Sequence, residues 1–322
     1  MNPPAGDQRD PSSLPSPYAA ARVHPGPALQ AIDGGRPFGV HIRMAWWKSL
    51  ILIAALPSTL AVTQLGLYLL AGLVEGDPFA PELTPLKLLA ANVSTGLTAL
   101  IAVILVARFA KVPWRTVFSS PRRFDRRRLV IYFLGSLVIV GIGIAIVGAT
   151  APEAVGWTGF GITGTTLGLV AVAALTTPIQ TTGEEIIFRG AILPGAGSWF
   201  RSVKPAFITG LVVSSLMFAF LHAATDVGLF AYYVFFSACT ALMGLITRGL
   251  EAAIAFHTAN NLWTTMMNAL FTGGGAIAND RSQGAGGGLA LLVPAAASLA
   301  ALVMVWLLQR SRRAGEKHRT AG

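Results

Sequence analysis

The sequence predicts an all-α polytopic membrane protein with about eight transmembrane helices, and two observations support this. Hydrophobic residues make up 53% of the 322-residue chain and charged residues only 12%, and the mean hydropathy is +0.62. Such values suit a membrane protein better than a soluble domain. In addition, eight apolar windows of about 20 residues are each long enough to cross a hydrocarbon core of roughly 30 Å.

The N-terminal residues precede the first of these windows. Residues 1 to about 40 contain eight prolines among serines, glycines and alanines, without helical or strand periodicity. This composition predicts a disordered tail, which we extend to residue 45. The first apolar run begins near Ser49 and is too long for a cleaved signal peptide, so it is predicted to be a true span.

The apolar windows follow one another to the end of the chain. They lie near residues 49–74, 86–107, 129–149, 163–182, 206–224, 228–247, 251–271 and 288–308. Pro178 predicts a kink in the fourth window. Two glycine clusters, at 273–275 and 284–288, predict a flexible loop before the last one.

Basic residues are distributed unevenly between the two sides that eight spans create. Of the 24 lysines and arginines, 22 fall on the side of the two termini, Arg189 among them, and only Lys87 and Arg281 fall opposite. Because cytoplasmic loops carry the excess of basic residues, we predict a multi-pass protein of the cell membrane with both termini cytoplasmic. The cytoplasmic loops thereby explain the net charge of +10. The predicted partners include the lipid bilayer, and no nucleic-acid partner is predicted. The sequence does not define an oligomeric state.

The single cysteine is Cys239, which lies in an apolar run. One cysteine cannot form an intrachain disulfide. Free cysteines are usually buried, so we predict a buried structural thiol.

Charged residues within apolar sequence are the most informative feature. Glu184 and Glu185 stand one helical turn before Arg189 in the segment GEEIIFRG. A charge at the bilayer centre costs about 3 kcal/mol on insertion scales, so such residues usually face a cavity and have a function. The alternatives are a buried ion-pair network or the cytoplasmic end of a helix. Spacing alone does not decide which glutamate pairs with the arginine.

Two histidines, His222 and His257, also lie in predicted spans. Phe218 precedes His222 by four residues, and Asn261 follows His257 by four, so each pair lies on one helix face. Carboxylates, imidazoles and a carboxamide can together activate water. The carboxylate would act as the base, the imidazoles as metal ligands or oxyanion donors, and the amide as an oxyanion donor. Hydrolysis is the reaction class that uses all of these groups.

The segments GEEIIFR, FAFLH and HTANN closely resemble the EExxxR, FxxxH and HxxxN/D motifs of the CPBP intramembrane proteases. That family includes the type II CAAX prenyl endopeptidases and bacterial proteins related to bacteriocin immunity and abortive infection. The resemblance covers about residues 161–271. It implies a catalytic set of six residues: Glu184, Glu185, Arg189, His222, His257 and Asn261. In that set one glutamate activates the hydrolytic water and the arginine orders the carboxylates.

The resemblance leaves the metal dependence open. The family is commonly described as metalloproteases, but a glutamate-activated water with His and Asn as oxyanion donors is also argued for it. The sequence has no HExxH, the familiar zinc motif on a helix. If a metal is bound, Zn²⁺ is the predicted ion, with Glu185, His222 and His257 as its ligands.

The sequence therefore predicts an intramembrane endopeptidase that cleaves membrane-associated peptides or proteins, either CAAX-like or bacteriocin-related. Its predicted segments are a tail (1–45), N-terminal helices (46–160), a catalytic core (161–271), and a last helix with a basic tail (272–322). Two rivals are a proton-coupled transporter, against which stands the lack of a repeated half, and a non-catalytic immunity or scaffold protein.

The predicted span boundaries place the two histidines at different depths. At about 1.5 Å per residue, His222 would lie about 25 Å from the start of its helix and His257 only about 10 Å from the start of its own. A shared centre needs equal depth. We therefore predict either that the fifth span starts near Val212, later than Pro205, and runs past Asp226, or that it is strongly tilted.

Overall fold

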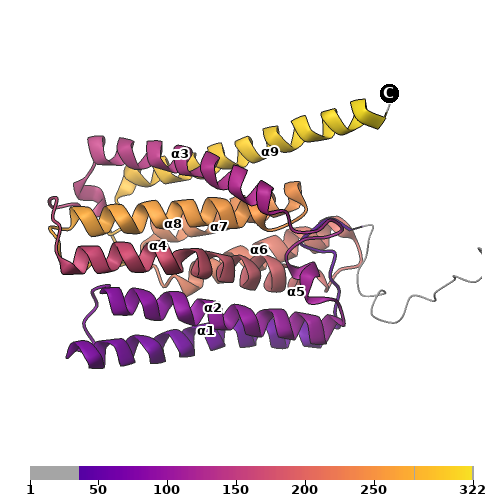
Figure 1. The fold of residues 1–322 in the computed structure, drawn as a ribbon. Helices are drawn as coiled ribbons and strands as arrows, with labels where there is room; N and C mark the ends of the chain where they lie inside the picture. Colours follow the sequence, from indigo (N-terminus) through magenta and orange to yellow (C-terminus); the bar gives the residue numbers. More distant parts are fainter. Residues whose placement is uncertain (1–35, 279, 321–322) are drawn as a thin grey trace, which may run out of the picture.

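The computed structural model describes residues 36–278 and 280–320 and has no strand within them, only three isolated bridges. Eight long helices match the eight predicted windows (Figure 1). They are α1 (Trp46–Glu75), α2 (Pro85–Ala110), α3 (Arg126–Thr150), α4 (Gly164–Glu185), α6 (Val203–Leu221), α7 (Val227–Thr247), α8 (Glu251–Phe271) and α9 (Leu292–Thr320). The short elements are η4 (Trp114–Val117), η5 (Glu153–Val155), η6 (Ile186–Ile192), α5 (Leu193–Gly197) and η7 (Gly288–Leu291). Residues 1–35 of the tail predicted for 1–45 lie outside the described residues.

Six of the described helices are long and apolar enough to be candidate membrane spans. They are α1, α2, α3, α6, α7 and the run Gly288–Ala314, which contains most of α9. The other two long helices, α4 and α8, carry motif residues. They lie within the bundle, because α4 packs between α2 and α8, and α8 packs against α3, α4 and α7 (Figure 1).

The amphipathic character of α4 explains how a helix with so many polar residues can lie in a membrane bundle. Leu167, Leu175 and Ile179 are exposed on its outer side, where lipid can solvate them. Thr177, Thr181 and both glutamates are buried. Polar side chains in membrane helices usually face the bundle interior in this way.

Local signals in the sequence fix where several helices begin. Thr163 forms a capping box with Thr166 at the start of α4. Asp125 caps α3, and Asp226 caps α7 by accepting the N–H of Leu229 at 2.7 Å. Short polar side chains at these positions satisfy backbone donors that the first helical turn leaves unpaired.

The predicted disordered tail ends earlier than residue 45. Phe38, Val40 and Ile42 are at most 2% exposed and pack into the core. His41 stacks on Phe38, accepts the N–H of Gly39 through Nδ1 at 3.2 Å, and donates from Nε2 to the carbonyl of Thr116 at 3.0 Å. Burial lowers the pKa of His41 to about 4, although the hydrogen bond to Thr116 opposes this shift. An imidazole held neutral therefore helps to attach this segment to the bundle.

The helical run that begins with α4 continues through η6 and α5 to Gly197. Arg189 lies inside this run and is 2% exposed, so its assignment to the loops on the side of the termini is wrong. The loop before α6 is the short segment 198–202. Several other basic residues of that side also lie in helices, among them Lys48 of α1, Arg108 of α2 and Lys204 of α6.

The bounds of α6 differ from the first prediction about the fifth span. This helix begins at Val203 and ends at Leu221, with His222 as its C-cap, so the later start and the extension past Asp226 are wrong. Instead α8 begins inside the protein, because Glu251 in its first turn is fully buried. Glu251 forms a bidentate ion pair with Arg122, at 2.5 and 2.7 Å. His257 is only 2% exposed although it follows the start of α8 closely.

Candidate active site

The two glutamates close the regular part of α4. After Glu185 the chain forms π-helical turns over η6, directly before Pro194. A proline lacks a backbone N–H, and its ring clashes with the carbonyl four residues earlier. The wider π turns accommodate this, and such turns are frequent at functional sites. By contrast α4 passes Pro178 and stays α-helical up to Glu185.

The glycines at both ends of GEEIIFRG allow close packing of this run. A Cβ at Gly183 would lie 3.0 Å from the carbonyl oxygen of Thr95 in α2, and a Cβ at Gly190 would lie 2.6 Å from Cγ1 of Val117 in η4. Because only glycine fits such approaches, these two contacts fix the helix on either side of the carboxylates.

Glu185 is fully buried between a cation and an imidazole. Its Oε1 accepts a hydrogen bond from Nδ1 of His257 at 2.8 Å, and its Oε2 lies 3.3 Å from Nε of Arg189. The arginine therefore pairs with Glu185, which answers the question that spacing left open.

Glu184 faces the other ring nitrogen of His257. Its Oε2 lies 3.3 Å from Nε2 of that ring, and its Oε1 accepts a hydrogen bond from Gln180 at 2.6 Å. The Gln180 amide oxygen accepts a hydrogen bond from Asn261 at 3.1 Å. Glu184, Gln180 and Asn261 thus form one chain of hydrogen bonds between α4 and α8.

Arg189 extends this network to two further helices. It donates to the carbonyl of Ser237 in α7 at 3.1 Å, and its guanidinium lies 4.8 Å from the ring centroid of Phe218 in α6. A buried guanidinium needs such partners, because an unpaired charge is expensive in the bundle interior.

His222 is adjacent to this network but makes no hydrogen bond to its side chains within the described residues. Its ring lies between Phe218, at a centroid distance of 4.4 Å, and Tyr233, at 4.1 Å. Nδ1 donates to the carbonyl of Phe218 at 2.7 Å. Phe218 also touches His257, with ring centroids 5.9 Å apart, so one phenyl ring joins the two imidazoles. In the neutral form of His222, Nε2 then carries the lone pair.

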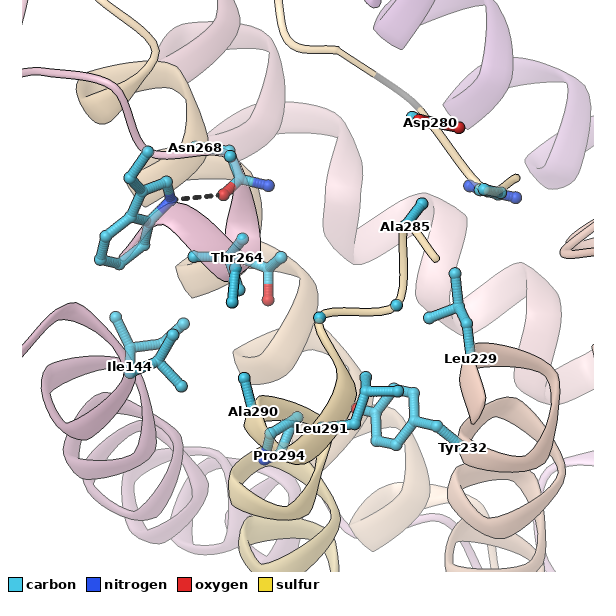
Figure 2. Close-up of a pocket in the computed structure, with 18 of the residues that line it drawn as sticks. Ile144, Leu229, Tyr232, Thr264, Asn268, Asp280, Ala285, Ala290, Leu291 and Pro294 are labelled. Carbon is cyan, nitrogen blue, oxygen red and sulfur yellow. Dashed lines mark hydrogen bonds between the residues drawn. The ribbon is translucent and has the colours of Figure 1, made fainter. Parts of the chain in front are cut away.

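A pocket of about 680 Å³ reaches both His222 and Asn261. Figure 2 shows its walls, with Ile144 of α3, Thr264 and Asn268 of α8, Tyr232 of α7 and Pro294 of α9 around the opening. The pocket size lies in the range of small-molecule and peptide sites.

The donor set does not fit the predicted zinc site. Within the described residues no group of three His, Cys, Asp or Glu side chains is arranged to hold a metal ion. Both ring nitrogens of His257 face carboxylates, and Nδ1 of His222 faces a backbone carbonyl. Glu185, His222 and His257 therefore do not converge on one point.

Sequence reasoning missed the residues that link the motifs. Gln180 joins Glu184 to Asn261, and Tyr233 stacks on His222. Arg281, predicted on the side opposite the other basic residues, donates to the backbone carbonyl of His222. Gln180 lies one helical turn before Glu184, and this spacing could have identified it. Tyr233 and Arg281 carry no such signal. Cys239 is buried and free, as predicted.

Residues 163–263 match the family model of Rce1-like type II CAAX prenyl endopeptidases. The chain is also 30% identical over 181 residues to the uncharacterized protein YyaK of Bacillus subtilis (strain 168), a match that covers 53% of this chain and 58% of YyaK. No solved structure matches the chain. The family match confirms the resemblance drawn from the three motifs.

Proposed function

We propose that this protein is an intramembrane endopeptidase in which Glu184 activates water for direct attack on a peptide bond. The observation that carries the proposal is the pair of buried carboxylates around the ring of His257, connected by Gln180 to an amide that lines a pocket. The substrates would be membrane-associated peptides or proteins cut near a terminus, CAAX-like or bacteriocin-related.

The surroundings of the two glutamates favour Glu184 as the base. Oε2 makes no hydrogen bond within the described residues in either glutamate, but the side chain of Glu184 is the more exposed of the two, at 11% against 0%. Glu185 is committed to Arg189 and to His257. We therefore assign Glu185 the role of holding the ring of His257 and the guanidinium in place.

The proposed reaction needs one proton to move twice. Glu184 takes a proton from water while the water oxygen bonds to the peptide carbonyl carbon. The C–N bond then breaks as the same proton passes to the leaving amine nitrogen, which leaves a carboxylic acid and an amine. A positioned general base and acid of this kind contributes about 10²–10⁴-fold to a rate.

The carboxamide and the imidazoles would stabilise charge around the reacting carbonyl. Asn261 has two N–H groups and gives one to Gln180, so the other can donate to the developing oxyanion. His257 would stabilise Glu184 throughout. His222, which lines the same pocket, would accept a hydrogen bond from a substrate N–H through Nε2.

Zinc stays a prediction and enters no step of this proposal. A chelator distinguishes the two mechanisms, because loss of activity on chelation and its return with Zn²⁺ would require a donor arrangement different from the one described above.

The rivals are tested together with the proposal. Purified protein in detergent would be incubated with a panel of fluorogenic and lipidated peptides, with and without chelator. Wild type would be compared with Glu184→Gln, His222→Ala and His257→Ala, each checked for folding by circular dichroism, and with Glu75→Gln, an exposed glutamate at the end of α1, as control. We expect cleavage by wild type and the control alone. Cleavage that persists unchanged in all three site variants would contradict the proposal, and proton-driven uptake in vesicles without cleavage would favour a transporter.

A further inference from the structure

The pocket beside the candidate site lies at one end of the bundle. Its lining includes the C-terminal halves of α3 and α8, the N-terminal ends of α7 and α9, and the loop before η7. All of these chain ends meet at the same end of the molecule, because the helices run up and down in sequence (Figure 1). The pocket therefore connects the site to that end.

One face of α8 makes the wall of this pocket polar. Five lining residues lie within nine positions of the helix: Asn260, Asn261, Thr264, Thr265 and Asn268. Residues 260, 264 and 268 are four apart and form one line along the helix, and 261 and 265 form the line beside it. This polar α8 face begins at the amide that contacts Gln180 and ends at Asn268, whose Oδ1 accepts the indole N–H of Trp157 at 2.8 Å (Figure 2).

The hydroxyls of the polar α8 face are available to a ligand. Thr264 is exposed in the pocket (Figure 2), and neither Thr264 nor Thr265 makes a side-chain hydrogen bond to another described residue. Eight residues of helix rise about 12 Å, the length of roughly four residues of extended peptide. An extended peptide carries an N–H and a C=O at every residue and must satisfy them inside a membrane protein. Amides and hydroxyls provide both donors and acceptors.

The charge distribution indicates which side of the membrane this end faces. The basic loops 111–125, 198–202 and 248–250 join the opposite ends of the same helices, and an excess of basic residues marks the cytoplasmic side. The pocket end instead has Glu153, Asp280 and Arg281 on its lining.

We propose that substrate enters from the non-cytoplasmic side and lies as an extended chain along the polar α8 face, with its scissile bond at Asn261. This inference rests on the proposed function and adds to it the approach route and the groove that binds the main chain. The substrate class is therefore an unfolded, membrane-associated peptide segment exposed outside the cytoplasm.

The first arm of the test does not depend on cleavage. Ala285→Cys places a thiol at the pocket (Figure 2), and Ser202→Cys places one at the exposed start of α6 on the basic end. The native Cys239 is buried, so wild type serves as background. A membrane-impermeant PEG-maleimide added to intact cells should label Ala285→Cys, and should label Ser202→Cys only after permeabilisation. The reverse pattern would overturn the inference.

The second arm uses the fluorogenic peptide that wild type cleaves fastest. Thr264→Val with Thr265→Val keeps side-chain shape and removes two hydroxyls, so KM should rise about tenfold if each lost hydrogen bond costs about 0.7 kcal/mol. Thr59→Val in α1, outside the pocket, is the matched control. PEG attached to Ala285→Cys should abolish cleavage, and PEG on Ser202→Cys should not.

The two proposals fail in distinguishable ways. If wild type cleaves while both the valine double variant and PEG-blocked Ala285→Cys retain its KM and rate, the groove is wrong and the protease assignment stands. If wild type cleaves nothing in the panel, the protease assignment fails, and the labelling arm still decides whether the pocket faces outward.

Discussion

Glu184 and Glu185 are neighbours in sequence, but their surroundings differ. Glu185 faces Arg189 and His257 with no exposed surface, whereas Glu184 faces an amide and the other side of the same ring. Two carboxylates and one guanidinium together leave one negative charge. The cluster becomes neutral when it takes up a single proton. In the proposed mechanism this proton comes from the attacking water.

Replacement of Glu185 should reduce stability more than replacement of Glu184. Glu185→Gln leaves the buried guanidinium of Arg189 without its carboxylate, and breaking a buried pair from one side costs about 3–5 kcal/mol. Thermal unfolding in detergent, followed by circular dichroism, measures this against Glu184→Gln. Adding Arg189→Met to Glu185→Gln removes both charges and should recover part of the loss. Strictly additive losses in the double variant would contradict the ion pair.

Gln180 is expected to act as a positioning residue for Glu184 and Asn261. Gln180→Met keeps the length of the side chain and removes both hydrogen bonds. We expect kcat to fall roughly 10–100-fold, the equivalent of about 1.4–2.8 kcal/mol, with KM within twofold because Gln180 does not line the pocket. Steady-state kinetics with the cleaved peptide measure both constants. An increase in KM with unchanged kcat would mean that Gln180 contacts the substrate instead.

The packing of η6 against η4 explains the glycine at the end of GEEIIFRG. Gly190→Ala would place Cβ 2.6 Å from Val117 Cγ1, and overpacking of this kind costs about 1–3 kcal/mol. Thermal unfolding should show this loss. Adding Val117→Ala removes the clashing atom and should restore more than half of it. If the second substitution makes the loss larger, the helix is not fixed by this contact.

The segment that precedes α1 should detach on acidification. The folded protein keeps His41 neutral down to about pH 4, whereas the unfolded chain binds a proton near the ordinary pKa of 6.5. The stabilisation is thus complete above pH 6.5 and is lost as the pH falls to about 4, and it amounts to about 2 kcal/mol between pH 7 and pH 4.5. Limited proteolysis over this range should show cleavage within 36–45 at low pH. His41→Phe should show little change with pH, and an equal pH dependence in that variant would contradict the assignment.

The sequence predicted the number and order of the long helices because lipid-facing helices need long apolar runs, and each window is one such run. It placed the end of the fourth helix near 182, since Glu184, Glu185 and Arg189 resemble a polar helix end. They instead satisfy one another and His257 inside the bundle. A group of polar residues therefore indicates the end of a helix only where these residues have no partners on another helix.

Five of the six predicted site residues form one network through Gln180, and the sixth, His222, lies next to it across the ring of Phe218. Motif spacing identified the residues, but it could not show that α8 starts inside the protein through the Arg122 and Glu251 pair. Depth depends on where each helix begins relative to the others, and this is a property of the tertiary structure. For the same reason the sequence did not predict the packing of Phe38, Val40 and Ile42, since the prolines that precede them indicated a disordered tail.

The molecule as a whole combines an apolar exterior with one buried polar seam along α4 and α8. The six candidate spans provide the exterior, and the seam contains the carboxylates, His257 and the polar wall of the pocket. A protein of this design can admit water and a peptide to the seam without exposing its charges to lipid.

Binding and cleavage of one peptide by wild type and by Glu184→Gln, measured in the same samples, test this account most directly. Fluorescence anisotropy would report binding and mass spectrometry the products, with Glu75→Gln as control. The account predicts that Glu184→Gln binds the peptide with a Kd within about threefold of the wild-type KM and forms product at least 10²-fold more slowly. Product formation by Glu184→Gln at the wild-type rate would contradict it.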